Sequence, residues 1–209
     1  MFLYNLELST VSGGTSSSQQ DQYRWLCGCI DNQSNLTQYD LQQLCTERRH
    51  MLGRFKIPYV TYLLNKIWDK RYICICPSID IARELYTLNQ LGSCCTDARF
   101  PQKVNESNLK EFNNGDKDHL FAVGELPDNY KPKDIDAIIL VQPDDIDSNM
   151  LHKCSHALTE HPKIYLFRFT GTTDDWTIQT AVESVDHKKL TEFTFKRELL
   201  NRKTTWTDI

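Results

Sequence analysis

Short apolar segments alternate with helical patterns between residues 72 and 141, and this alternation is the strongest constraint on the fold. The segment Tyr72 to Pro77 predicts a buried strand, and the amphipathic segment Ser78 to Asn89 predicts a helix. A second strand is predicted at His119 to Val123 and a third at Ile135 to Val141. Strands that alternate with helices in this way are typical of β-α-β units in a parallel sheet. We therefore expect an α/β domain.

The residues before this unit predict a mainly helical segment. We expect a short strand within residues 1–8 and a helix at 18–30. A second helix should start at Leu41 and continue to residue 68. It should break near Gly53 and restart at Pro58, because proline is tolerated in the first turn of a helix but not in its interior.

The residues that follow the first strand predict further elements. Ile81, Leu85 and Leu88 should face the sheet from a helix that Gly92 stops. Residues from Trp176 to about Leu200 should be helical or mixed. The remaining expectations are a loop at 93–107, short helices at 108–113 and 149–160, the second of them ended by Pro162, and a strand at 163–169.

The charges are unevenly distributed along a chain whose net charge is −4. Residues 43–71 carry seven Lys/Arg against two acids, and residues 188–203 carry six against two. Residues 106–147 carry eleven acids against four lysines. Such asymmetry indicates either a nucleic-acid-binding face or ordinary basic helix surfaces, and the sequence leaves both interpretations open.

Several classes of site lack their sequence signals. No Gly-Lys pair occurs, so the P-loop motif is missing. The eight cysteines do not show paired C-x₂-C spacing, and the acidic run at 144–147 does not have EF-hand spacing, so we expect no metal site. A nucleophile pair of Cys154 with His152 or His156 is disfavoured, since helical offsets of two point to different faces. We also expect no signal peptide, no membrane segment, free thiols and a cytoplasmic location.

Motifs on both sides of the second strand carry a family resemblance. Ser78, Ala82 and Leu85 follow the first strand, while Leu109, Phe112 and Gly115 precede the second, with Asn105 at an arginine position. Upstream lie Ser17 to Tyr23, Arg48-Arg49, and a lysine that is Lys56 or Lys66. From about residue 15 to 180, this order resembles the second RecA-like lobe of superfamily-two helicases together with the segment before it.

The resemblance implies a three-layer RecA-like domain with a mostly parallel sheet, preceded by a helical segment. It divides the chain into a helical lead-in with a short N-terminal strand at 1–70, a helicase C-terminal-like lobe at 71–185 and a basic C-terminal extension at 186–209.

The ATP-facing motif of the family departs from its usual pattern here. Its glutamine, its glycine and its two arginines correspond to His152, Ser155, His156 and Thr159, on the predicted helix before Ile164 and Gly171-Thr172. Arginine fingers supply permanently charged, bidentate donors to the γ-phosphate, and neither threonine nor a mostly neutral histidine replaces them. We therefore expect these four residues to be vestigial, with no catalytic residue and no cofactor in this chain.

The resemblance favours a catalytically inactive lobe that binds nucleic acid or protein within a larger complex, for example a viral or phage one. The predicted nucleic-acid contacts are Ser78, Arg99, Asn129 and Lys131, at the carboxyl edge of the sheet. Asn129 and Lys131 replace the glycine and the acid of a family motif.

One alternative is half of a split helicase, completed by a partner protein that carries a P-loop lobe. Another is a purely structural or assembly protein. Partners would be DNA, RNA or that protein, in the host cytoplasm or a virion, and not a membrane.

Overall fold

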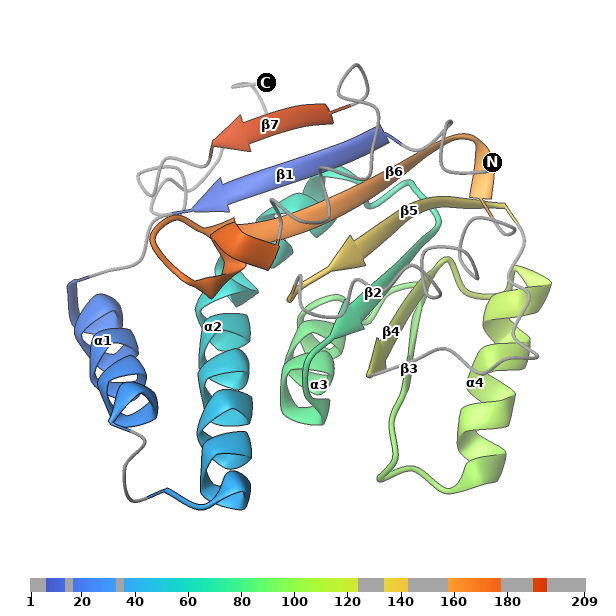
Figure 1. The fold of residues 1–209 in the computed structure, drawn as a ribbon. Helices are drawn as coiled ribbons and strands as arrows, with labels where there is room; N and C mark the ends of the chain where they lie inside the picture. The colour runs from blue at the N-terminus through green and yellow to red at the C-terminus, as the bar shows by residue number, and fades with distance from the viewer. Residues whose placement is uncertain are drawn as a thin grey trace.

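A parallel β-sheet forms the centre of the computed structural model, which describes residues 7–13, 17–32, 36–123, 134–142, 158–177 and 190–194. Within these residues the sheet has seven strands in the order β3-β4-β2-β5-β6-β1-β7, and every pairing is parallel (Figure 1). The strands are β1 (Glu7–Gly13), β2 (Tyr72–Cys76), β3 (Ser93–Thr96), β4 (His119–Val123), β5 (Ile135–Leu140), β6 (Leu158–Phe169) and β7 (Leu190–Thr194).

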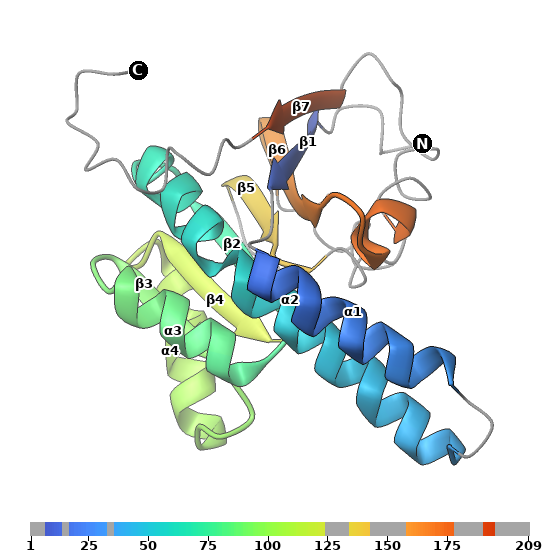
Figure 2. The ribbon, with the colours of Figure 1, turned by 90° about the vertical axis from the view of Figure 1, so that its left-hand side faces the viewer.

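Helices α1 (Ser17–Asp31), α2 (Gln38–Lys66), α3 (Ile79–Leu88) and α4 (Gln102–Asn114) accompany the sheet, and residues 173–177 after β6 are also helical. Figure 2 shows α1 lying along α2, so that the two form a helical hairpin beside the sheet. The fold is therefore a RecA-like α/β domain preceded by a helical segment, as the sequence predicted.

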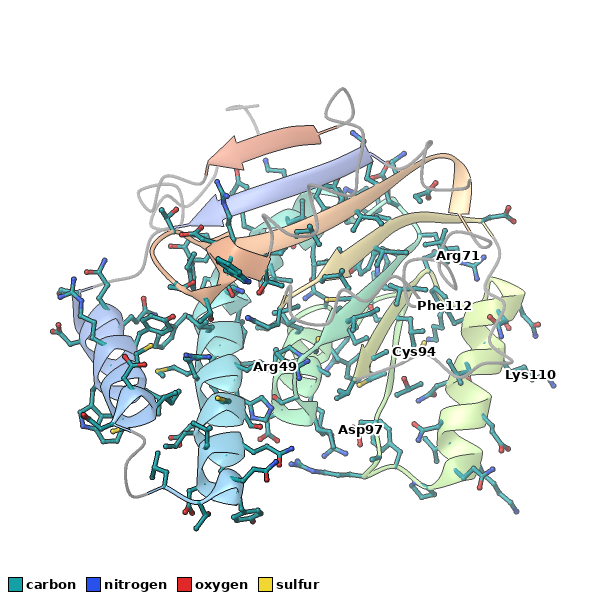
Figure 3. The ribbon with its side chains drawn as sticks, viewed as in Figure 1. Arg49, Arg71, Cys94, Asp97, Lys110 and Phe112 are labelled. Carbon is teal, nitrogen blue, oxygen red and sulfur yellow. The ribbon has the colours of Figure 1, made fainter. Side chains whose placement is uncertain are left out.

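The two faces of the sheet are covered by different helices. Side chains alternate between faces along a strand. Cys74, Cys95 and Phe121 face the cluster that contains buried residues of α2 and α3. Their neighbours, among them Cys94, point to the other face, where the Cys94 thiol donates to a carbonyl of α4 at 3.5 Å. Figure 3 shows α4 with Phe112, Lys110 and the nearby Arg71, whose guanidinium carbon lies 4.7 Å from the Phe112 ring centre.

Helix α2 corrects the prediction of a break near Gly53. It runs without interruption from Gln38 to Lys66, with Pro58 inside it on the exposed side. Gly53 serves a packing purpose instead. A Cβ atom there would lie 2.7 Å from Pro77 and 2.8 Å from Ile81. The missing side chain lets α2 pack closely against the turn between β2 and α3.

Other predicted boundaries also move. Residues 93–107 are not a loop, because they form β3 and the first part of α4, which begins six residues earlier than predicted. The strand β3 was not predicted because four residues are too few to show the alternation of apolar and polar side chains that identifies a strand. Leu88 does not face the sheet: it is 56 % exposed, because α3 ends there and Asn89 caps it.

The predicted helix at 149–160 is wrong at its end, since residues 158–160 begin β6 and residues 149–157 lie outside the described range. Pro162 lies within that strand. The register between β5 and β6 shifts beside it: Ile135 pairs with Leu158, whereas Ala137 pairs with Lys163. Proline inside a strand is typical of such irregularities, because it cannot donate a ladder hydrogen bond. At the chain start, β1 lies beyond most of the short strand predicted within residues 1–8.

His119 is a buried histidine at the amino end of β4. Its ring stacks on Tyr72 with 4.1 Å between centres. Nε2 lies 3.0 Å from the Trp68 carbonyl oxygen, which requires an N–H on that atom, and Nδ1 lies 3.2 Å from the Ser93 hydroxyl. Burial lowers the pKa of His119 below its ordinary value of 6.5.

The lowered pKa of His119 predicts a loss of stability in mild acid. The unfolded chain takes up this proton at a higher pH than the folded chain does, so stability is complete above pH 6.5 and falls as the pH drops below it. Urea unfolding between neutral and mildly acidic pH should show this slope, and His119→Gln should reduce it. His50→Gln on α2 is the control. An equal slope in His119→Gln and the native protein would contradict the assignment.

Two glycine substitutions should have opposite effects on stability. Gly53→Ala should lower the free energy of unfolding by about 1–3 kcal/mol, because the new methyl group overpacks the contact with Pro77 and Ile81. Gly28→Ala, in α1, meets nothing within 4 Å and should raise it by about 0.5–1 kcal/mol. Urea unfolding of both variants tests this. A stabilised Gly53→Ala variant would show that α2 does not need the close approach.

Candidate nucleic-acid interface

The carboxyl ends of β2 and β3 carry two of the residues predicted to bind nucleic acid. Ser78 follows β2 and caps α3, where its hydroxyl oxygen accepts a hydrogen bond from the Ile81 amide at 3.4 Å. Arg99 lies in the loop between β3 and α4. Asp80 links the two regions, since it stands in the first turn of α3, two residues after Ser78, and pairs with Arg99 at 2.9 Å.

Arg54 approaches the same carboxylate from α2. Its guanidinium nitrogen lies 3.9 Å from the second oxygen of Asp80. The side chains of Arg54, Asp80 and Arg99 are each more than half exposed. We call these three residues the exposed rim. The rim unites three elements and presents two guanidinium groups to solvent.

A second ion pair, between Arg83 and Asp97, helps to hold the loop that carries Arg99. Arg83 donates through Nε at 2.8 Å and through a terminal nitrogen at 3.4 Å to the two oxygens of the buried Asp97 carboxylate. Its guanidinium carbon also lies 4.8 Å from the Phe100 ring centre. Burial alone would raise the pKa of Asp97. The hydrogen bonds from Arg83 and from the Arg99 amide outweigh it and lower the pKa from its ordinary value.

Asn105 holds the loop that presents Arg99. Its amide donates to the Asp97 carbonyl at 2.8 Å and accepts from the Asp97 amide at 3.2 Å. Asn108, one turn later, donates to the Cys95 carbonyl at 2.7 Å. Asn105, where the resemblance implies an arginine, thus supports the loop backbone.

A buried polar cluster lies at the carboxyl ends of β5 and β6. It consists of Lys56, Gln142 and Asp174, and we call these three residues the buried triad. The Lys56 ammonium lies 2.7 Å from the Asp174 carboxylate and donates to the Gln142 carbonyl oxygen at 2.7 Å. Gln142 in turn donates to Asp174 at 2.7 Å. Asp174 also accepts from the Phe169 amide at 3.0 Å. All three side chains are buried, so each charge and lone pair depends on its partners.

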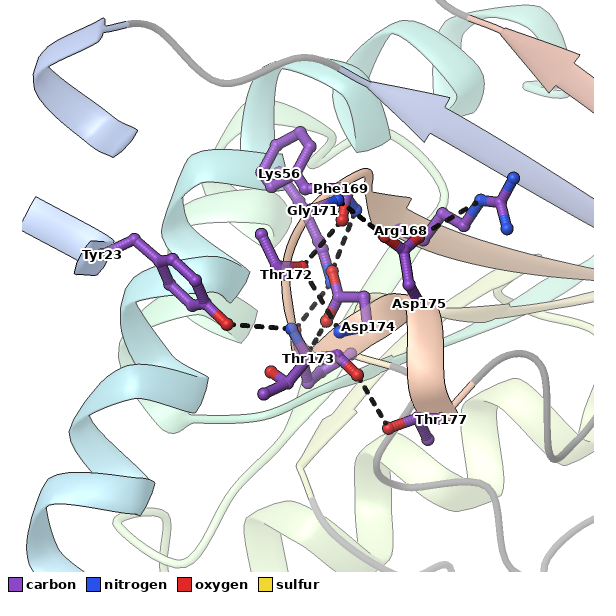
Figure 4. A network of polar contacts seen from close by, with 11 residues as sticks. Tyr23, Lys56, Arg168, Phe169, Gly171, Thr172, Thr173, Asp174, Asp175 and Thr177 are labelled. Atoms are coloured by element: carbon purple, nitrogen blue, oxygen red, sulfur yellow. Dashed lines mark hydrogen bonds and ion pairs between the residues drawn. The ribbon is translucent and has the colours of Figure 1, made fainter. Parts of the chain in front are cut away.

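Figure 4 shows how neighbouring contacts tie this cluster to α1. The Thr173 amide donates to the Tyr23 hydroxyl at 2.9 Å. Thr172 donates to the Phe169 carbonyl at 2.7 Å, and the Gly171 amide donates to Asp175 at 2.6 Å. Burial, followed by the hydrogen bond with Cys27, raises the pKa of Tyr23. The loop after β6 is therefore fastened to both α1 and α2.

The remaining predicted site residues are less fully placed. Asn129, Lys131, His152, Ser155 and His156 lie outside the described residues. The backbone of Thr159 belongs to β6 rather than to the predicted helix.

Sequence reasoning missed several residues of the candidate site. Arg54 was counted only as part of a basic region, and neither Asp80 nor Asp97 was singled out. The spacing of Asp80 and Arg83 on one helix was the available signal, but the partners of both residues come from other elements. Lys56 and Lys66 were equivalent in the sequence. Only Lys56 is buried, whereas Lys66 lies 5.2 Å from the Tyr62 ring centre.

Within the residues that the structure describes, His, Cys, Asp and Glu side chains do not gather in any group of three that could hold a metal ion. None of the helices described there is both long and apolar enough to cross a membrane.

Comparison with solved structures gives clear fold matches. The C-terminal domain of a Sulfolobus solfataricus SWI2/SNF2 ATPase aligns over 88 % of each chain, with a TM-score of 0.60 and 10 % identity. The chain folds as a helicase C-terminal RecA-like lobe. No protein-family model and no curated protein sequence matches it.

Longer ATPases contain the lobe as one part. The core of the Sulfolobus enzyme, solved in complex with double-stranded DNA, aligns with a TM-score of 0.69 and 9 % identity. T4 UvsW aligns with a TM-score of 0.57 and 7 % identity. These alignments cover 86 % and 91 % of this lobe, but only 44 % and 42 % of the two longer chains.

Loss of the buried ammonium group should destabilise the lobe strongly. Lys56→Met leaves the Asp174 carboxylate buried without its counter-charge, which should cost about 3–5 kcal/mol. Lys56→Met combined with Asp174→Asn should be more stable than Lys56→Met alone, because the amide needs no counter-charge. Lys66→Met is the control and should cost less than about 1 kcal/mol. Urea unfolding measures all three. Equal losses for Lys56→Met and Lys66→Met would contradict a structural role for the triad.

Proposed function

We propose that this lobe binds the sugar-phosphate backbone of DNA or RNA at the carboxyl ends of β2 and β3, without hydrolysing ATP by itself. The observation that carries the proposal is the exposed rim, where Arg54 and Arg99 from separate elements reach solvent beside Asp80, two residues after the helix cap Ser78. Arginine and hydroxyl donors are the usual ligands of backbone phosphates. Asn129 and Lys131 are proposed to extend the same contact.

The fold comparison supports nucleic acid as the kind of partner. The Sulfolobus ATPase core, whose C-terminal domain has this fold, was solved with double-stranded DNA. Open parallel sheets bind ligands at the carboxyl ends of their strands, and the rim lies at that edge. We propose that the chain acts as a binding module within a larger complex, of which a viral or phage assembly is one example.

The absence of hydrolysis is proposed from the residues at the ATP-facing motif. His152, Ser155, His156 and Thr159 stand where the resemblance implies a glutamine, a glycine and two arginines. None carries a guanidinium, so the charge that develops on a transferred phosphoryl group would lack its usual partner.

Salt-dependent binding tests the nucleic-acid proposal. Fluorescence anisotropy with labelled single-stranded and duplex oligonucleotides should show binding that weakens steeply between about 50 and 200 mM salt. Arg99→Gln should weaken binding and reduce the slope of log affinity against log salt by about 1, because one phosphate contact is lost. Lys110→Gln, on α4, removes the same charge elsewhere and should change the slope little. No binding at low salt would reject the proposal and leave a structural or assembly role.

A second function is favoured by the small share of the longer ATPases with which this lobe aligns. The lobe aligns with less than half of the Sulfolobus ATPase core and of UvsW. As the alternative, we propose that it completes an ATPase with a P-loop lobe on another protein. Affinity capture followed by an ATPase assay of the mixture tests this. ATPase activity that appears only on mixing would support it, and recovery of no P-loop protein would argue against it.

A further inference from the structure

Asp80 lies between two guanidinium groups that come from distant parts of the chain. Its two oxygens face different partners, Arg99 at 2.9 Å and Arg54 at 3.9 Å. The three residues belong to the start of α3, the loop before α4, and the middle of α2. Two like charges held this close repel each other, and an anion between them offsets the repulsion because it attracts both. Asp80 supplies that anion.

The pairs within the exposed rim are weak enough to exchange. The side chains of Arg54, Asp80 and Arg99 are 63 %, 54 % and 54 % exposed, so water and salt compete for each of them. Exposed ion pairs of this kind typically change an equilibrium by no more than about fivefold. Replacing the Asp80 carboxylate with another anion therefore costs little.

The neighbouring pair of Arg83 and Asp97 is different in kind. The Asp97 carboxylate is fully buried, accepts two hydrogen bonds from one guanidinium and also accepts from the Arg99 amide. Arg83 is further restrained against Phe100. Of these two sets of contacts, only the exposed rim has an anion that solvent can reach and replace. The fixed pair keeps the Arg99 loop in place while that exchange occurs.

We propose that Asp80 occupies the position of a backbone phosphate in the free protein, and that a bound phosphodiester displaces it from Arg54 and Arg99. A carboxylate and a phosphodiester both present one negative charge over two oxygens. Asp80 is then an internal competitor that lowers affinity for nucleic acid and keeps the two arginines together until a strand arrives. This inference rests on the proposed function, because it concerns regulation of the same rim.

Replacing Asp80 should raise the affinity for nucleic acid. Asp80→Asn removes the competing charge but keeps the shape of the side chain, so labelled oligonucleotides should bind at least about threefold more tightly at low salt. Asp116→Asn is the matched control, because it makes the same change in net charge next to the opposite edge of the sheet. Its effect should stay below about twofold. Asp80→Ser provides a second variant, since serine is also tolerated near a helix start.

The arginines themselves provide the second arm of the experiment. Adding Arg99→Gln to Asp80→Asn should remove the gain in affinity, because the double variant lacks the guanidinium that loss of the Asp80 charge makes available. If the native protein binds and Arg99→Gln weakens it, but Asp80→Asn and Asp80→Ser bind no better than Asp116→Asn, the competitor role is overturned and the proposed function stands. If neither the native protein nor Asp80→Asn binds any oligonucleotide, both are overturned. Weaker binding by folded Asp80 variants would also overturn the inference, since Asp80 would then help to position Arg99.

Discussion

The ion pair between Lys56 and Asp174 is the contact on which the arrangement of the lobe depends. It joins the middle of α2 to the loop after β6, more than a hundred residues later in the chain. Both groups are buried, so neither can exchange its partner for water without a large cost. Gln142 and the Phe169 amide use the remaining hydrogen-bonding capacity of the pair. The ends of β5 and β6 are thereby held at a fixed position relative to α2.

The same helix carries the residues of the proposed interface. Gly53, Arg54 and Lys56 lie within one turn of α2, and each has a different partner. Gly53 allows close packing on Pro77 and Ile81, Arg54 reaches the rim, and Lys56 enters the core. Helix α2 is thus fixed on both sides of Arg54. A guanidinium that is more than half exposed still approaches Asp80 from a well-defined direction, because the backbone beneath it is held by buried contacts.

The sequence predicted those elements whose hydrophobic pattern is long enough to be recognised. Residues 72–76, 120–122 and 137–140 are fully buried parts of strands, and their continuous apolar runs indicate this directly. The strand β3 escaped prediction because Ser-Cys-Cys-Thr is too short for a period. Pro58 and Pro162 misled because Pro58 lies on the exposed side of a continuous helix and Pro162 lies at the register shift between β5 and β6. The candidate interface was only half predictable, since Ser78 and Arg99 follow strands, whereas Arg54 and Asp80 stand out only by their proximity in the fold.

The position of β1 has a consequence for how the chain must assemble. Glu7 pairs with Lys163 and Leu8 pairs with Leu190, so one strand near the start of the chain lies between two strands from its last quarter. Tyr72 and His119, by contrast, are paired across fewer than fifty residues. Joining distant segments costs more conformational entropy than joining near ones, and such contacts slow folding. The half of the sheet that bears Ser78 and Arg99 can therefore form from a continuous piece of chain, whereas the β6-β1-β7 half needs segments from both ends.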